Sequence, residues 1–327
     1  MTTPATAQSG APTGGEGPQA GWTTASRRIG DRIFSGSAVA SGVLILLTLA
    51  AVAAFLIYEG YPALVADPVD VPGGEGFLAF VGPLLFGTVL AAVIALVVAV
   101  PLSIGIALFI SHYAPRKVAA VLGYLVDLLA AVPSVVYGLW GIFFLAPQVV
   151  PVYRWLENTL GFIPIFAGPT STTGRTMLTA GLVLAVMILP IMTAVNREVF
   201  LQTPTLQEEA SLALGATRWE MIRMTVLPFG RSGIVSASML GLGRALGETL
   251  AVAMLLSASN VITVNLISST NTNTIAANIA LDFPESSGLA VNALIASGLV
   301  LFVLTFVVNY AARAIVARRR DFSGANA

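Results

Sequence analysis

The chain has 327 residues, of which 56% are hydrophobic and only 10% are charged. Soluble domains are about a quarter charged, so this composition predicts a membrane protein. The absence of cysteine excludes disulfides and thiolate metal sites, and the single histidine, His112, argues against a metal enzyme. The 16 basic and 16 acidic residues balance to zero net charge, so their distribution along the chain is more informative than their sum.

Residues 1–30 are predicted to form a disordered cytoplasmic tail, because Thr, Pro, Gly, Ala and Ser dominate it as far as about residue 26. A signal peptide is not indicated, since Arg27 and Arg28 follow this stretch instead of preceding a short apolar core. Residues 31–320 are predicted to form one transmembrane domain, and residues 321–327 a second cytoplasmic tail.

Apolar stretches long enough to cross a bilayer recur along the transmembrane domain. A spanning helix needs about 20 apolar residues. Six stretches meet this length, at about 38–58, 80–110, 118–146, 176–196, 232–258 and 289–312. The second and third are overlong and contain Pro83, Pro101 and Pro133, which predicts tilted or kinked helices. The expected fold class is therefore all-α and polytopic, with about six transmembrane helices.

Two loops between these spans are rich in turn-forming or polar residues. The loop at 147–175 contains Tyr153-Arg154-Trp155-Leu156, which predicts a short interfacial helix. The loop at 259–288 is rich in Asn, Ser and Thr and is interpreted as a connecting loop. Either loop is a candidate contact for an extracytoplasmic partner.

The polar stretch 203–228 between the fourth and fifth spans has its own helix boundaries. Thr205 with Glu208 fits a capping box, and Pro204 after Thr203 is an equally good helix start. Gly215 fits a helix-ending turn, and Thr217 with Glu220 fits a second capping box. The sequence predicts a helix, a glycine turn and a second helix, which Pro228 ends.

One face of the second helix is predicted to bind a partner. Trp219, Ile222 and Val226 fall on one helical face, flanked by Arg218 and Arg223. Because so small a helix cannot bury that face in a core of its own, a groove on another protein is a plausible acceptor. A plain surface hairpin is the alternative.

Three ionisable residues lie within predicted spans: Asp127, Arg244 and Glu248. Each costs about 2.5–3.5 kcal/mol at a helix centre, so each should face protein or water. Arg244 and Glu248 are four residues apart and are predicted to share one face of the fifth span. One interpretation is a buried ion pair, with or without Asp127. The other presents the guanidinium to an anion in a translocation path, where its planar fork suits phosphate.

Ser134, beside Pro133, is a further candidate polar group in the third span. No histidine or lysine lies within a predicted span to activate it as a nucleophile, so its hydroxyl is interpreted as satisfying the kinked backbone. The sequence contains no P-loop motif and no constellation for a membrane hydrolase. No catalytic or metal-binding residue is predicted.

The distribution of basic residues predicts that both termini and the stretch 203–228 are cytoplasmic. The side assigned to the cytoplasm carries Arg27, Arg28, Arg32, Arg116, Lys117, Arg197, Arg218, Arg223, Arg231, Arg313, Arg318, Arg319 and Arg320. The opposite side has only Arg154 and Arg175.

The stretch 203–228 resembles the EAA loop of ATP-binding-cassette importer permeases. The matching pattern is Glu209-Ala210-Ser211, three residues, Gly215, nine residues, then Thr225-Val226-Leu227-Pro228. Ser211 replaces the usual Ala, and Thr225 the usual Ile. The runs 131–141 (AVPSVVYGLWG) and 241–249 (GLGRALGET) resemble two signatures of phosphate importer permeases. Together the three matches resemble the Pst phosphate transporter family, permease C more than permease A.

This resemblance implies a type I importer permease fold and a set of partners. These are a paralogous phosphate permease, a dimeric ATPase that binds ATP and Mg²⁺, an extracytoplasmic phosphate-binding protein and membrane lipid, with no nucleic acid. No cofactor is expected in this chain. The resemblance assigns ATPase coupling to Glu209, Ala210, Gly215, Arg218, Trp219, Leu227 and Pro228. The predicted substrate path comprises Arg244, Glu248, Asp127 and Ser134.

Two alternatives remain open from the sequence. The cargo of the permease is another small oxyanion, such as sulfate or molybdate, or the chain is a secondary transporter or channel that needs no ATPase. An inverted repeat would favour a secondary transporter, and none is evident.

Overall fold

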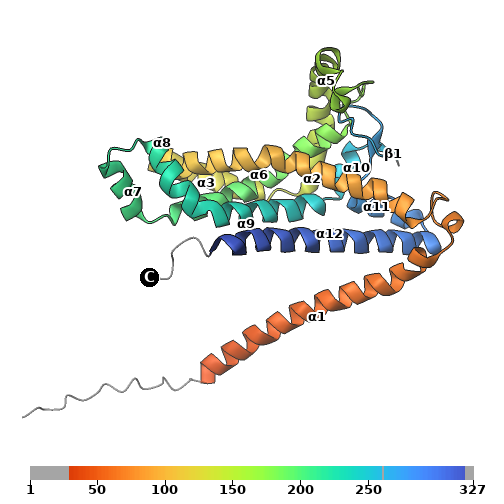
Figure 1. The fold of residues 1–327 in the computed structure, drawn as a ribbon, viewed down its shortest axis with the longest axis horizontal. Helices are drawn as coiled ribbons and strands as arrows, with labels where there is room; N and C mark the ends of the chain where they lie inside the picture. Colours follow the sequence, from red (N-terminus) through yellow and green to blue (C-terminus); the bar gives the residue numbers. More distant parts are fainter. Residues whose placement is uncertain (1–28, 260, 321–327) are drawn as a thin grey trace, which may run out of the picture. The chain divides into compact units, whose positions relative to one another are not determined.

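The computed structural model describes residues 29–259 and 261–320, and within them the chain is almost entirely helical (Figure 1). The predicted tails at 1–28 and 321–327 lie outside the described residues. The described part of the chain divides into two units at residue 52, one comprising residues 29–52 and the other the described residues from 53 onward. The α-helices are α1 (Ile29–Val65), α2 (Phe77–Leu108), α3 (Arg116–Ala130), α4 (Ser134–Trp140), α5 (Ala146–Leu160), α6 (Met177–Leu201), α7 (Thr205–Ala213), α8 (Arg218–Met221), α9 (Leu227–Leu246), α10 (Leu250–Leu255), α11 (Ile275–Asp282) and α12 (Leu289–Arg320).

Besides these helices and three π-helical turns described below, the structure has three short 3-10 turns and one pair of two-residue strands. The 3-10 turns are Pro68–Asp70, Pro164–Phe166 and Phe283–Glu285. The strands β1 (Ala258–Ser259) and β2 (Asn271–Thr272) pair in parallel. These segments are too short to form a layer of their own, so the prediction of an all-α fold is confirmed.

Five stretches of the described helices are long and apolar enough to cross a membrane, against six predicted. They are 33–65, 77–113, 134–160, 177–201 and 289–314. The predicted fifth span corresponds largely to α9, in which Arg231, Arg244 and several glycines and serines interrupt the apolar run. The predicted interfacial helix around Tyr153 is part of α5, and the Tyr153 side chain is buried.

Two predicted spans are broken helices. The third breaks between α3 and α4, because Pro133 has no N–H to donate and disfavours helical geometry in the residue before it. The Tyr137 hydroxyl donates to the Leu129 carbonyl at 2.8 Å and so satisfies one end of this break. The fifth breaks at 247–249, where Gly247 ends α9 and a new helix, α10, begins.

Three other prolines are accommodated by π-helical turns, in which each bond spans one extra residue. The turns Phe109–Tyr113, Gly141–Leu145 and Ile222–Val226 each end two residues before a proline, namely Pro115, Pro147 and Pro228. The prediction that Pro228 ends a helix is therefore wrong. The helix continues from α8 through the π turn into α9, with Pro228 in the first turn of α9, where a missing N–H costs little.

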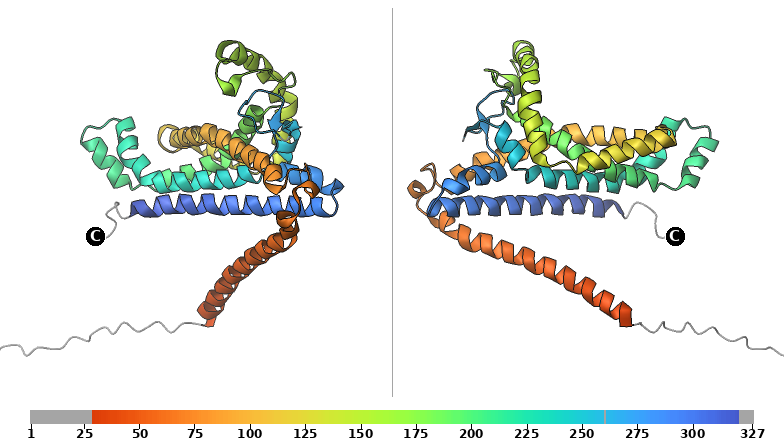
Figure 2. Two further views of the ribbon diagram at one scale, coloured as in Figure 1. Left: turned by 45° about the vertical axis from the view of Figure 1, so that its right-hand side comes forward. Right: turned by 180° about the vertical axis from the view of Figure 1, so that it is seen from behind.

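Within the second unit, α6 is the central helix. It packs against α2, α9 and α3, and its apolar residues, including Leu184 and Ile188, are fully buried. Figures 1 and 2 show α7 and α8 at one end of α6 and α9, and β1 with α10 and α11 toward the other end. A separate apolar cluster at the α7 end joins Leu108 of α2 and Phe200 of α6 to Ile222 and Val226.

Candidate functional site

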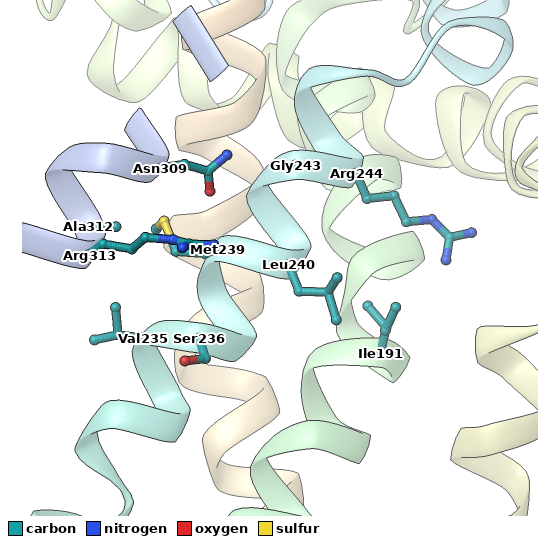
Figure 3. Close-up of a pocket in the computed structure, with 10 residues that line it drawn as sticks. All are labelled: Ile191, Val235, Ser236, Met239, Leu240, Gly243, Arg244, Asn309, Ala312 and Arg313. Atoms are coloured by element: carbon teal, nitrogen blue, oxygen red, sulfur yellow. The ribbon is translucent and has the colours of Figure 1, made fainter. Parts of the chain in front are cut away.

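A groove of about 790 Å³ runs along one side of α9, between α6 and α12 (Figure 3). Asn309 and Arg313 of α12 lie beside Met239 on one flank of α9, and Arg244 extends from the other flank. Gly243 lies between the flanks, and a side chain added there would meet no atom within 4 Å. The lining residues are Ile191, Val235, Ser236, Met239, Leu240, Gly243, Arg244, Asn309, Ala312 and Arg313.

The residues that line the groove include two arginines and no carboxylate. Its charged lining residues are Arg244 and Arg313, and its neutral polar ones are Ser236 and Asn309. Among the described residues, no carboxylate lies within ion-pair distance of either arginine. A positively charged cleft with low-dielectric walls attracts anions, because the negative charge of the anion balances arginines that no carboxylate of the protein neutralises.

Glu248 does not pair with Arg244, and the predicted shared helical face does not exist. Because α9 ends at Leu246, the two residues are separated by a turn instead of one helical repeat. The Glu248 side chain is buried, and its Oε1 accepts a hydrogen bond from the backbone N–H of Ala251 at 3.1 Å. The carboxylate thereby satisfies one of the free amides at the start of α10.

Asp127 and Ser134 belong to the other broken helix. Asp127 lies on the exposed side of α3, where its Oδ2 is 3.8 Å from Nη2 of Arg197 on α6. Ser134 is the first residue of α4 and is half-buried. The structure therefore places the four predicted path residues on two broken helices, with only Arg244 in the groove. In the described parts of the chain, no three histidine, aspartate or glutamate side chains gather as a metal site.

The two broken helices meet at α4 and α10. A side chain added at Gly138 would place its Cβ 2.9 Å from Cα of Ala251, and one at Gly141 would lie 2.7 Å from Cγ2 of Val183. Both glycines occur in the run that resembles a phosphate-permease signature. Gly138 allows the backbones of α4 and α10 to approach closely, and Gly141 makes room for the Val183 side chain of α6.

The stretch 203–228 forms a helix, a turn and a second helix, as predicted. Gly215 has φ +90° and ends the first helix, and Thr217 and Glu220 form the predicted capping box. The other predicted capping box is absent, since no side chain caps α7, and the Glu208 carboxylate instead contacts His112. The π turn that follows α8 then leads directly into α9.

The predicted partner-binding face of the second helix is mostly buried in the protein's own core. Ile222 and Val226 are fully buried against α2 and α6, so only Trp219 of that face is exposed. The prediction was wrong because the helix is longer than its polar stretch and packs at the end of the bundle. The exposed surface comprises Leu206, Glu209, Ala210, Leu214, Gly215, Arg218, Trp219 and Pro228, with Leu227 half-buried.

The loop at 259–288, interpreted as a plain connection, builds the opposite end of α6. The Asn271 side chain accepts from the Met177 N–H at 3.0 Å and donates to the Arg175 carbonyl at 3.2 Å. Nη2 of Arg175 donates to the Leu256 carbonyl at 3.2 Å, at the end of α10. These residues were not predicted, because an Asn- and Thr-rich segment has the same composition whether it is ordered by side-chain hydrogen bonds or solvated.

Comparison with known proteins identifies the family. Residues 99–321 match the family described as binding-protein-dependent transport system inner membrane component. Phosphate transport system permease protein PstC 2 of Mycobacterium tuberculosis is 50% identical over 300 residues, covering 88% of this chain and 92% of that protein. PstC of Mycobacterium leprae is 46% identical over 297 residues, covering 87% and 92%, respectively.

Solved structures of importers share the fold. A chain of a bacterial ABC transporter that imports the acidic polysaccharide alginate matches with TM-score 0.52 and 17% identity, covering 87% of this chain and 99% of its own length. A chain of the inward-facing MetNI methionine ABC transporter matches with TM-score 0.51 and 17% identity, covering 74% and 95%. The chain is a multi-pass membrane protein with an ABC importer permease fold. It belongs to the binding-protein-dependent transport system inner membrane components, and within them to the phosphate transport system permease proteins of the PstC type.

Proposed function

We propose that this chain is a membrane-spanning permease subunit of an ATP-driven phosphate importer. The names of its relatives support phosphate as the cargo. The observation that carries the proposal is the groove beside α9, in which Arg244 has no carboxylate partner among the described residues. Arg244 is half-buried. A guanidinium without a counter-ion is costly at membrane depth, and an oxyanion with paired acceptors supplies the missing charge.

The groove is open along its length and forms half of the translocation path, which a paralogous permease closes. An extracytoplasmic phosphate-binding protein delivers the anion, and an ATPase dimer supplies the energy and binds ATP and Mg²⁺. The chain itself is a transport subunit and not an enzyme. Its termini and the segment 203–228 face the cytoplasm, in agreement with the basic residues at Arg197, Arg218, Arg223 and Arg231.

Transport proceeds by alternating access. ATP binding closes the ATPase dimer and draws together the exposed surfaces of α7 and α8, which carry Glu209 and Trp219. The helices then reorient so that Arg244 faces outward and receives phosphate. Hydrolysis resets the inward-facing state. The ATPase can drive this change only because it binds one conformation of the permease more tightly than the other.

Uptake by the complete reconstituted transporter tests the role of Arg244. In Arg244→Ala, ATP-dependent phosphate uptake should fall by about tenfold or more, since a hydrogen bond to a charged group is lost. Arg244→Lys retains the charge but loses the planar fork, so its uptake should lie between those of the alanine variant and the wild type. Parallel assays with sulfate identify the cargo, and wild-type phosphate uptake in both variants would exclude Arg244 from the path.

The substitution Glu248→Gln tests whether the buried carboxylate acts as a charge or only as a helix cap. The amide oxygen of glutamine can still accept from the Ala251 N–H, so assembly and thermal stability should be unchanged. If the charge itself has a role in transport, phosphate uptake should fall while both of these remain normal, because the substitution removes the negative charge at the break between α9 and α10. Unchanged uptake would assign Glu248 to capping alone.

A further inference from the structure

The single histidine of the chain connects the end of α2 to α7. His112 lies in the π turn that continues α2, and its Nε2 is 3.4 Å from Oε1 of Glu208 in the first turn of α7. Both groups are shielded from solvent, with side-chain exposures of 9% for the imidazole and 21% for the carboxylate. A polar contact is worth more at such a site than on an open surface, because water competes less for the same groups.

The other nitrogen of the ring is held by the neighbouring serine. Nδ1 of His112 is 2.6 Å from Oγ of Ser111, and Ser111 also lies 2.8 Å from the Ala107 carbonyl. A neutral ring with its proton on Nε2 donates to Glu208 and accepts from Ser111, and a protonated ring donates at both positions. In either state the ring contacts both Glu208 and Ser111. The single Ser111 proton goes to Nδ1 of the neutral ring, and it is free to go to the Ala107 carbonyl of α2 when the protonated ring donates to Ser111.

Helix α7 has few other attachments to the membrane domain. None of its residues is buried, and it contacts α8 and the π turn 222–226 of its own hairpin. Across the described residues, His112–Glu208 is the one side-chain hydrogen bond that joins α7 to the chain outside 203–228. A displacement of α7 therefore reaches the bundle through this hydrogen bond, through packing against the π turn 222–226, or through the backbone on either side of α7. Of these routes, the hydrogen bond is the one that leads directly to the end of α2.

The helix that receives the contact extends into the core and reaches the far end of the bundle. α2 packs along α6, and Oγ1 of Thr88 accepts a hydrogen bond from the Ile275 N–H at 2.9 Å, at the start of α11. A continuous helix is stiff along its axis, so a displacement applied at His112 is carried toward that end.

We infer that His112 is a positioning residue: together with Glu208 it transmits the movement of α7 into α2 and so couples ATP hydrolysis to transport. The inference rests on the proposed function, since it takes the ATPase to be what moves α7. Without the contact, α7 moves with the ATPase while α2 lags behind. Hydrolysis then continues with less phosphate transported.

Two substitutions at His112 distinguish the contribution of Nε2, which contacts Glu208, from that of Nδ1, which contacts Ser111. The amide nitrogen of glutamine extends about as far as Nε2 and can donate to Glu208, whereas asparagine reaches only as far as Nδ1 and keeps only the Ser111 contact. In the complete transporter in proteoliposomes, His112→Asn should lower the phosphate moved per ATP hydrolysed by about tenfold, the effect of losing one hydrogen bond to a charged group. His112→Gln should retain most of this ratio.

The matched control is Tyr113→Phe, a change at an exposed neighbour in the same π turn. ATPase rate, subunit assembly and the transport-to-hydrolysis ratio should all remain at wild-type values. Equal ratios in His112→Asn, His112→Gln and the wild type would overturn the inference. Loss of assembly in parallel with uptake would also overturn it, by assigning His112 a purely structural role.

A reversible cross-link provides a second measurement that does not depend on substitution effects alone. The chain has no cysteine, so His112→Cys combined with Glu208→Cys introduces its only thiols. The double variant should be uncoupled, and a short thiol-cleavable cross-linker between the two cysteines should restore the ratio until it is cleaved. Failure of a formed cross-link to restore coupling contradicts the inference. A wild-type transporter without ATP-dependent uptake would instead refute the proposed function.

Discussion

At the scale of single residues, the capping box predicted at the start of α8 is confirmed, with both of its reciprocal hydrogen bonds present. The Glu220 carboxylate accepts from the Thr217 N–H and hydroxyl, both at 2.8 Å, and the Glu220 N–H donates to Oγ1 of Thr217. These hydrogen bonds favour the ionised carboxylate and lower the pKa of Glu220 from its ordinary value of 4.5. The cap fixes the entry to α8 beside the exposed Trp219.

The lowered pKa of Glu220 gives the cap a defined pH dependence. Its contribution to stability is fully present above the unfolded pKa and is lost as the pH falls through the lower folded pKa. Local amide exchange at 217–221, corrected for intrinsic rates, should therefore be constant from pH 8 down to about 5 and rise only below the ordinary carboxyl pKa. A rise at neutral pH would contradict this assignment.

Removing the hydroxyl tests the same cap without changing the pH. Thr217→Ala deletes the acceptor for the Glu220 N–H and should destabilise the first turn of α8 by about 1 kcal/mol. Amide exchange at 218–221 should increase about fivefold, since exchange follows the local opening equilibrium. The buried π turn at Ile222 should keep its protection, because the α2–α6 cluster holds it independently.

At the scale of elements, the contact between α4 and α10 depends on glycine. Gly138 faces α10 at a separation that leaves no room for a Cβ, whereas Gly105 on α2 has nothing within 4 Å of the same position. Because well-packed interiors relax only partly, an added methyl group must displace the facing backbone.

The pair Gly138→Ala and Gly105→Ala therefore makes a matched test. We expect Gly138→Ala to lower the thermal unfolding midpoint of the detergent-solubilised complex, through overpacking that costs about 1–3 kcal/mol. Gly105→Ala should leave the midpoint unchanged or raise it, because alanine is the better helix former by about 1 kcal/mol. Equal midpoints in the two variants would mean that α4 and α10 do not pack closely in solution.

The positions of the helices could be predicted from the sequence more reliably than their continuity. Apolar length alone located α1, α2, α6 and α12, because a bilayer imposes a minimum length. The effect of each proline was not predictable in this way: Pro83 and Pro101 lie inside the continuous α2, Pro133 breaks a helix and Pro228 lies within one. The difference lies in long-range contacts, such as the Tyr137 hydroxyl at the break and the buried π turn before Pro228.

The candidate site could be predicted only in part, because its geometry also depends on contacts between residues that are distant in the sequence. Arg244 and Glu248 were singled out because a charge in an apolar run is conspicuous. The prediction that the two residues share one helical face was wrong. It assumed a continuous helix across 247–249, where the chain instead makes a turn. His112, Asn309 and Arg313 were not singled out as site residues, because each depends on a partner distant in the sequence.

At the scale of the whole molecule, the helices present more apolar surface than the chain itself covers. In the first compact unit, Leu44, Leu46 and Leu47 of α1 are all exposed. In the second unit, Phe143 and Phe306 are exposed as well. Exposure of this kind on several helices is expected where lipid or another membrane subunit surrounds them, which agrees with a multi-pass membrane protein.

The two ends of the second unit allow a direct test of membrane orientation. Leu214, next to the turn between α7 and α8, is 91% exposed, and Phe162, just after α5, is 80% exposed. The positive-inside rule places Leu214 in the cytoplasm and Phe162 outside. Because the chain has no cysteine, Leu214→Cys and Phe162→Cys each introduce one thiol into this subunit.

A membrane-impermeant maleimide should label Phe162→Cys in intact cells and Leu214→Cys only in inside-out vesicles. Adding the ATPase subunit should protect Leu214→Cys and leave Phe162→Cys unaffected, because only the α7–α8 surface is proposed to contact it. Labelling of Leu214→Cys from outside the cell would invert the topology and separate α7 from any ATP-driven partner. If Leu214→Cys is labelled from the cytoplasmic side and the ATPase subunit does not protect it, the proposed topology holds but Leu214 does not contact the ATPase.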